Sequence, residues 1–533
     1  MKIPQLFGTL TLGLIMYTFS YGQTQVVYVP LHHPVYDYLE RLTIESIVDW
    51  DGLVQPASRI EVAQRLLQAE AHKSKLSDVE LDELLYYEKE FRPELLALGR
   101  SQSDTTMRWH LFSYEDSSFS TYLDPILGET VSKGDSHLFN GAEIEGTAGS
   151  SVGYGFRFYD NTEKGSNIDR VKQYVPETGI DITNSTGPQE IEYDEVGAYV
   201  SYGSSKLQLS VGKGFVEWGS GNGGKLILSD KAPEFPMIRL DYFPVPWLTF
   251  HYMHGWLQSL VIDSLLSYQT SLPYAPRNIY REKYIAAHML SLRPITGFEF
   301  SLGESIIYSD GPPNILFLIP VMFFRAADHY LSHTSQNDGN NSQFFFDAKY
   351  DFLDHFRTYG TLFIDEIDTY QIFNPSKARN QLGFTLGTRI LNPPFKNVDV
   401  IIEYTRILPW VYSNSVAAQT YESDGYLLGD YIGQNADQIY TEVNWRPFRP
   451  LGFSAYYDYV RRGGMTDVQK EYELPSLPFL YGQVERATIK GAAVTYEPLH
   501  DLIAKCDLFW QNPYTTSNSF NVRLTLEYGL ELR

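Results

Sequence analysis

Residues 520–532 read FNVRLTLEYGLEL, and every second residue from Phe520 to Leu532 is apolar, while those between are polar or glycine. Successive side chains of a β-strand point to opposite faces, so this stretch has one apolar and one polar face. Strands of soluble proteins usually span about 5–6 residues. A strand that crosses the hydrocarbon of a membrane needs roughly 9–11 residues. The stretch therefore predicts a membrane-spanning strand of a β-barrel, whose wall separates lipid from water.

The same two-residue period recurs upstream, in residues 198–211, 398–404, 439–445, 451–459 and 502–510. The barrel region, residues 101–533, is about 430 residues long, and at roughly 23 residues or more per strand and connection it holds on the order of 16–18 strands. A soluble, aromatic-rich β-protein is the alternative. The 40 Tyr, 31 Phe and 8 Trp residues favour the membrane barrel, because they can form aromatic girdles at both membrane interfaces.

Three polar stretches are expected to be long outward loops of this barrel. They cover residues 161–190, 334–342 and 417–438. The longest apolar run beyond the N-terminal region, residues 315–324, contains Pro320 and is too short for a membrane-spanning helix. The sequence therefore argues against a helical membrane protein.

Residues 1–22 are expected to be a cleaved signal peptide. Lys2 supplies the positive charge, residues 6–19 are apolar, and small residues lie at the cleavage site before Gln23. The chain carries 42 Lys and Arg against 65 Asp and Glu, and this net charge of −23 is unsuited to binding nucleic acid. Its single cysteine, Cys506, excludes an internal disulfide bond.

Residues 23–100 are expected to form a small helical domain. Pro34 suits the start of a helix, and Gly52 breaks the chain. Ser58 with Glu61 and Ser77 with Glu80 have the capping-box spacing, so three helices are predicted. The apolar residues expected on the inner side of the third helix are Leu81, Leu84, Leu85, Phe91 and Leu95. The domain is either a plug that stabilises the barrel or a docking site for periplasmic export partners.

Two glycine motifs suggest enzymes but lack the required context. Residues 219–224 match G-x-G-x-x-G, yet no helix is predicted after them to receive a dinucleotide's phosphates. Residues 149–153 match G-x-S-x-G, but they lie in a Gly/Ser-rich strand region rather than between a buried strand and a helix. No enzyme activity and no cofactor are therefore expected.

Two histidine groups suggest a metal ion. His251 and His254 are three residues apart, which on a strand places them on opposite faces. Asp328, His329 and His333 have helical ligand spacing, but the sequence shows neither a further ligand nor the partners that would orient them. No metal site is predicted.

Several stretches together resemble the Wzi-type capsule assembly family. They are GKGFVEWGSG at residues 212–221, LILSDKAPEFP at 226–236, GESIIY at 303–308, LIP at 318–320 and PLHHPVYDYL at 30–39. The resemblance covers nearly the whole chain after residue 22. It implies an all-β transmembrane barrel of about 18 antiparallel strands with a small N-terminal periplasmic α-helical bundle. It also implies a lectin-like protein of the outer membrane that binds capsular polysaccharide or exopolysaccharide and catalyses nothing.

Candidate polysaccharide-binding residues lie in and near the glycine-rich stretch, because sugars stack on aromatic rings and need fixed polar partners for their hydroxyls. The first set is Trp218, Asn222, Lys225, Arg239 and Asp241. A second, weaker set is Glu304, Tyr308 and Arg325. The alternative is that the glycine-rich segment folds inward as a plug whose polar groups satisfy one another.

The sequence thus predicts a signal peptide at 1–22, a periplasmic helical domain at 23–100 and an outer-membrane barrel at 101–533. The expected function is to bind exported polysaccharide and support capsule assembly, with the polymer and membrane lipid as partners. A porin-like channel and a barrel that anchors an export machinery remain alternatives. The sequence leaves open which polysaccharide binds, whether the lumen is open, and the oligomeric state.

Overall fold

The computed structural model describes residues 26–529, except for a few internal stretches. These exceptions are residues 102–106, 205, 273–274, 336–338, 368–379, 465–476 and 515–517. The expected signal peptide and the last two apolar residues of the terminal repeat, Leu530 and Leu532, lie outside the described residues. Among the described helices, none has the length and apolar character needed to cross a membrane.

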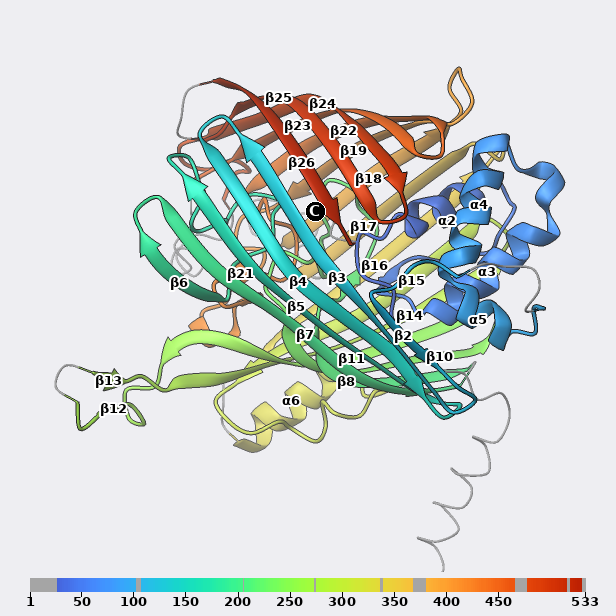
Figure 1. Cartoon of the computed structure of the whole chain (residues 1–533). Coiled ribbons are helices and arrows are strands. Elements are labelled where there is room, and N and C mark those ends of the chain that lie inside the picture. Colours follow the sequence, from blue (N-terminus) through green and yellow to red (C-terminus); the bar gives the residue numbers. More distant parts are fainter. Residues whose placement is uncertain are drawn as a thin grey trace, which may run out of the picture.

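Eighteen antiparallel strands, counted over the described part of the chain, form the wall of a closed barrel (Figure 1). The strands are β3 (Phe119–Ser132), β4 (Asp135–Ala148), β5 (Val152–Gly165), β7 (Glu190–Gly203), β8 (Leu207–Gly214), β10 (Phe235–Val245), β11 (Leu248–Ile262), β14 (Tyr280–Ile295), β15 (Phe298–Ser309), β16 (Asn341–Phe352), β17 (Phe356–Glu366), β18 (Gln381–Leu391), β19 (Val398–Ile407), β22 (Ala436–Phe448), β23 (Leu451–Arg462), β24 (Glu485–Leu499), β25 (Leu502–Asn512) and β26 (Ser519–Tyr528). This confirms the predicted barrel and its strand number.

The barrel closes where β26 pairs with β3, with Tyr528 opposite Leu127. The short strand β2 (Phe112–Glu115) pairs with the other half of β3, and β6 (Ile182–Gly187) adds to β7. In β26 the side chains of Phe520, Val522, Leu524 and Leu526 are exposed on the outer surface, as the alternation predicts for a lipid-facing wall.

The N-terminal region folds into four helices where three were expected. They are α2 (Val35–Ile44), α3 (Arg59–Ala71), α4 (Asp78–Glu90) and α5 (Arg92–Ala97). Both predicted capping boxes are present, at Ser58 and at Ser77. The expected third helix is divided at Phe91, because Pro93 has no N–H to continue it and suits the first turn of a new helix. Leu85, predicted to face inward, is exposed, since the buried side of α4 follows Leu84 and Tyr87.

Short turns lie at one end of the barrel, which we call the turn end, and most long connections lie at the other, the loop end. The helical domain packs on the turn end (Figure 1). Its helices meet the wall through ion pairs. Arg389 of β18 contacts Asp37 at 2.5 Å and Glu40 at 2.9 Å, and Arg357 of β17 contacts Glu40 at 2.9 Å. The domain therefore covers this mouth of the barrel.

Two long connections enter the lumen from the wall and form what we call the plug. Residues 215–234 contain β9 (Glu217–Trp218), which pairs with β1 (Val54–Gln55) of the N-terminal region. Residues 408–435 contain η3 (Ala417–Gln419), β20 (Glu422–Ser423) and β21 (Tyr426–Leu427). Apolar side chains of both connections belong to one core with the inner faces of the wall strands.

The second connection corrects a prediction, because residues 417–438 were expected to form an outward loop. Instead Ala418, Leu428 and Ile432 are buried. The physical reason is the tyrosines: the Tyr421 hydroxyl donates to the Ile227 carbonyl at 2.9 Å, so a residue that looks polar in sequence buries its ring and satisfies its hydroxyl inside the barrel.

Two further elements lie outside the wall. The connection between β15 and β16 contains α6 (Phe324–Ser335), which lies beside the outer surface of the barrel (Figure 1). The connection between β11 and β14 contains the hairpin of β12 (Tyr268–Gln269) and β13 (Pro276–Arg277), which projects away from the wall (Figure 1).

Candidate functional site

Trp218, the aromatic residue of the glycine-rich stretch, lies at the centre of the plug. Its side chain is only 1% exposed, and its ring centroid is 6.2 Å from that of Phe345 on the inner face of β16. On the backbone it pairs with Val54 and forms a bridge to Leu228. Gly219 follows with a φ of 101°, a conformation that glycine adopts readily. The indole is therefore covered on both sides by the protein itself.

Asn222 and Lys225 shape the turn that follows. The backbone N–H groups of Asn222 and Gly223 each donate to the Glu403 carboxylate at 2.9 Å. The Asn222 amide donates to the Tyr359 hydroxyl at 2.8 Å, and the Lys225 ammonium donates to the Gly219 carbonyl at 3.1 Å. Asn222 is the exposed member of the first predicted set, whereas Lys225 is half-buried.

Arg239 and Asp241 are buried on the inner face of β10. The guanidinium of Arg239 donates to the Pro56 carbonyl at 2.7 Å and lies 2.8 Å from Asp241. Asp241 also contacts His251 at 2.6 Å. These contacts tie the N-terminal region to the wall. The five residues of the first set therefore hold together the plug, the wall and residues near the helical domain.

Glu304, Tyr308 and Arg325, the second predicted set, lie on the opposite face of the wall. Glu304 and Tyr308 are buried beneath the segment that contains α6. Glu304 accepts hydrogen bonds from the backbone of Phe324 and Arg325, at 2.5 and 3.3 Å. The first set is divided between the plug, where Asn222 and Lys225 lie, and the inner face of β10, where Arg239 contacts Asp241, and the barrel wall separates it from the second set. Binding of sugar by these eight residues stays a prediction.

His251 and His254 lie on opposite faces of β11, as strand geometry requires, and the other histidine motif lies in α6. His251 faces the lumen, whereas His254 faces outward and contacts the Tyr308 hydroxyl at 2.6 Å. In α6, Asp328 is buried and accepts the Asn340 amide at 2.7 Å, while His329 and His333 are exposed. The helix therefore does not gather these three side chains around one point.

Among the described residues, two other groups place three ligand-type atoms within 4.8 Å of one another: His32, Glu217 and Asp230, and Glu497, His500 and Asp501. Both groups already have protein partners. His32 lies 2.9 Å from Asp230, and Glu217 lies 3.7 Å from the Lys225 ammonium. Glu497 accepts the Tyr86 hydroxyl at 2.5 Å, and Asp501 pairs with Arg108 at 2.6 Å.

Burial shifts the pKa values of two charged residues of the plug, Asp430 and Lys231, toward their neutral forms. Burial raises the pKa of Asp430 to about 7. Burial also lowers the pKa of Lys231 to about 8, although its ammonium donates to the Glu177 carbonyl at 2.5 Å. Both shifts are expected where bulk water is excluded, because a low dielectric disfavours the charged form.

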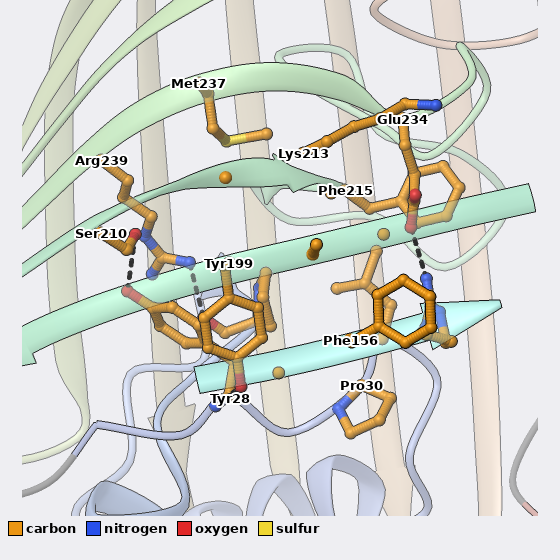
Figure 2. A pocket seen from close by; sticks show the side chains of 18 of the residues that line it. Tyr28, Pro30, Phe156, Tyr199, Ser210, Lys213, Phe215, Glu234, Met237 and Arg239 are labelled. Atoms are coloured by element: carbon orange, nitrogen blue, oxygen red, sulfur yellow. Dashed lines mark hydrogen bonds and ion pairs between the residues drawn. The ribbon is translucent and has the colours of Figure 1, made fainter. Parts of the chain in front are cut away.

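A cavity of about 100 Å³ lies between the inner face of the wall and residues 28–31 (Figure 2). Tyr28 donates to Ser210 at 3.1 Å on one side, and Arg157 pairs with Glu234 at 2.6 Å on the other. Ligand pockets usually have about 300–1,000 Å³. This cavity is therefore large enough for a few waters but too small for a chain of sugar rings.

Sequence reasoning did not find an aromatic group at the loop end of the barrel. We call Tyr174, Arg462, Glu485 and Tyr514 the loop-end cluster. The Arg462 guanidinium lies 3.8 Å from the ring centroid of Tyr174 and 4.3 Å from that of Tyr514, and it contacts Glu485 at 3.3 Å. Its Nη1 atom has no hydrogen-bond partner among the described residues. Tyr174 and Tyr514 lie in two connections, Arg462 ends β23 and Glu485 begins β24, so no single stretch of sequence displays the group.

Comparison with known proteins gives a family and a fold. A family model described as capsule assembly protein Wzi matches residues 133–512. The solved structure of Wzi from Escherichia coli, described as an outer membrane protein involved in group 1 capsule assembly and as a carbohydrate-binding β-barrel, is 14% identical. The alignment covers 96% of this chain and 100% of that chain, with a TM-score of 0.59.

Two other solved structures share less of the fold. OpdK from Pseudomonas aeruginosa, solved with vanillate, is 10% identical over 76% of this chain and 98% of its own, with a TM-score of 0.44. OccAB4 from Acinetobacter baumannii is 10% identical over 78% of this chain and 98% of its own, with a TM-score of 0.44. A search of curated proteins gave no match.

Proposed function

This chain belongs to the Wzi capsule assembly family and is an outer-membrane β-barrel, and from that premise we propose that it grips exported polysaccharide at the cell surface without conducting it through the lumen. The turn end with the helical domain then faces the periplasm, and the loop end faces outward. The lectin-like role needs no chemical step, only fixed polar groups and ring faces that suit sugars.

The observation that carries this proposal is the obstruction of the barrel. The plug packs against the inner faces of the wall, and the helical domain covers the turn end. A channel of this diameter would need a continuous watery path. The obstruction favours a binding protein over the porin-like alternative. A docking role for the helical domain stays a prediction, because the contacts described for that domain are with the barrel itself.

We place the polymer on the loop-end cluster. Tyr174 and Tyr514 offer ring surfaces for the apolar faces of sugars, and the guanidinium of Arg462 holds the two rings in place. Glu485 adds a carboxylate that can accept from sugar hydroxyls. For the eight residues predicted from sequence we propose a supporting role, in which they hold the plug and the outer segment in place. We keep Asn222 as a further contact, since it is the exposed residue of the first set, whereas the exposed Arg325 lies in the segment on the outer face of the wall.

The test uses cells that make the polymer and lack this protein. The wild-type chain should restore attachment of the polymer to the cells, whereas the double variant Tyr174→Ala/Tyr514→Ala should release the polymer into the medium while synthesis continues. Each ring contributes about 1 kcal/mol, so binding of the purified polymer should weaken by roughly thirtyfold.

The matched control is Tyr268→Ala/Tyr280→Ala, which removes two exposed tyrosines from the β12–β13 hairpin and the start of β14. It should behave as wild type. If cells without the protein keep their polymer attached, the proposed function is wrong. If attachment depends on the protein but the Tyr174/Tyr514 variant restores it fully, only the placement of the site is wrong.

A further inference from the structure

The outer face of the wall carries a polar patch at a position where the membrane should be. Along β15, Leu302, Glu304, Ile306 and Tyr308 share the outward face. Leu302 is 39% exposed, as expected for a lipid-facing residue, but Glu304 is only 2% exposed and Ile306 and Tyr308 are also buried. The neighbouring strands add His254 and His288 on the same face.

Residues 310–335, which we call the flap, cover this patch. The Glu304 carboxylate accepts the first backbone N–H groups of α6 and lies 3.3 Å from His288. It therefore satisfies donors that would otherwise be unpaired at the start of the helix. The Tyr252 hydroxyl donates to the Phe317 carbonyl at 2.9 Å, and the ring of Phe317 packs 4.8 Å from that of Tyr308.

The depth of Glu304 explains why the patch needs a cover. Glu304 lies five residues before Ser309, the last residue of β15, and five residues span roughly 16 Å along a strand. The apolar band of such a barrel is about 25 Å tall and the strands are tilted, so the carboxylate lies near the outer leaflet. Facing lipid without a partner would be unfavourable for a charged group at that depth. The flap removes this contact.

The far side of the flap is apolar and faces away from the protein. Val321 is 79% exposed and Phe323 is 54% exposed, and Ile315, Ile319 and Tyr330 are exposed as well. Ile315, Ile319, Val321 and Phe323 come from the apolar run at residues 315–324, and Tyr330 comes from α6. This surface is continuous with the lipid-facing wall on which the flap lies.

The charged and polar residues of α6 also suit a position at the membrane surface. Arg325, His329 and His333 are exposed, whereas Asp328, the helix's only acidic residue, is buried against Asn340. Helices that lie in a membrane interface typically combine basic residues with large apolar ones and bury their apolar side about 5–10 Å into the boundary between headgroups and acyl chains.

We propose that the flap is a membrane-interface element that inserts Ile315, Val321 and Phe323 into the outer leaflet and shields Glu304 and His288 from lipid. The partner is membrane lipid, and this role is independent of polysaccharide binding. The flap anchors the loop end of the barrel at a fixed depth in the bilayer.

The test places an environment-sensitive fluorophore on single cysteines of the full chain, in a Cys506→Ala background. The protein is reconstituted in phosphatidylcholine vesicles in which part of the lipid carries brominated acyl chains, which quench fluorophores in the membrane. A label at Val321→Cys should be quenched about as strongly as one at Leu524→Cys on the lipid-facing side of β26. It should be quenched at least about twofold more than one at Leu265→Cys, a 94% exposed residue on the β11–β14 connection.

Phe323→Cys serves as a second position in case the label at Val321 disturbs the flap. Quenching at both flap positions that is no greater than at Leu265 overturns the proposal. A further variant, Glu304→Gln, weakens the contact that holds the start of α6. We expect it to increase hydrogen exchange in the flap while leaving the exchange of β26 unchanged, and unchanged exchange in the flap would contradict the role of Glu304 as its cap.

Discussion

At the scale of single residues, Trp218 shows that a local sequence pattern can single out a residue without predicting its role. The glycine-rich stretch marks it as important, and both a ligand role and a plug role fit that pattern. The structure buries its ring between Val54, Phe345 and the chain around Leu228. Local sequence cannot decide this, because a connection that turns into the lumen and one that turns outward use the same turn residues.

Replacing Trp218 by alanine should therefore act on stability. Removing a large buried aromatic side chain costs about 3–5 kcal/mol. We expect Trp218→Ala to lower the temperature at which the purified barrel unfolds, measured by the loss of its compact, heat-modifiable migration on gels.

Trp218→Phe is the informative control, because the indole Nε1 has no hydrogen-bond partner among the described residues. Phenylalanine keeps most of the packing and loses no hydrogen bond, so its unfolding temperature should stay close to wild type. If Trp218→Phe lowers the unfolding temperature as much as Trp218→Ala does, the packing of the ring does not stabilise the barrel as we propose.

At the scale of elements, the sequence predicts what depends on a local period or a local cap. The terminal strand and both capping boxes follow from such signals and are confirmed. The prediction of an outward loop at residues 417–438 was wrong, because the course of this connection depends on which distant surface receives the tyrosine rings. The loop-end cluster was missed for the same reason, since Tyr174 and Arg462 meet only after the barrel closes.

The attachment of the helical domain can be tested at Arg389. Its side chain is buried and pairs with Asp37, Glu40 and Asp399. Truncating one partner of a fully buried ion pair costs about 3–5 kcal/mol, and the loss here should be smaller because Arg357 still contacts Glu40 and the side chain of Asp37 is 41% exposed. Arg389→Ala should therefore increase hydrogen exchange in α2 while the wall strands stay protected.

Arg281→Ala is the matched control, because it breaks an ion pair with Asp310 that is exposed to solvent. Exposed pairs contribute at most about 1 kcal/mol. No change in the exchange of α2 is expected for this variant. Equal protection of α2 in wild type and in Arg389→Ala would mean that the ion pairs do not hold the domain.

At the scale of the whole molecule, the barrel wall is predictable and its contents are not. Chain length and period predict roughly 16–18 strands, and the family resemblance implies about 18, but the plug is built from segments that are distant in the sequence. The prediction that belongs to this scale concerns ion flow. In planar bilayers, the wild-type protein should show little steady conductance, because the plug and the helical domain obstruct the lumen.

Replacing residues 217–232 by a short Gly/Ser linker should raise the conductance in steps of uniform size, provided that the variant keeps the migration of a folded barrel on gels. Replacing the β12–β13 hairpin by the same linker should leave conductance low, since that hairpin lies outside the wall. If the wild-type protein conducts ions as freely as the plug variant, the porin-like channel would be the better explanation of its function.

The two inward connections leave the wall between β8 and β10 and between β19 and β22, and they meet where Tyr412 and Tyr421 bond to the carbonyls of Leu226 and Ile227. They act as a strut across the cylinder. Lateral pressure from the bilayer, or the pull of a long polymer under flow, is then shared by opposite sides of the wall, and the cross-section resists being flattened. The rim above this strut can hold its shape before any ligand arrives, which lowers the entropic cost of capture.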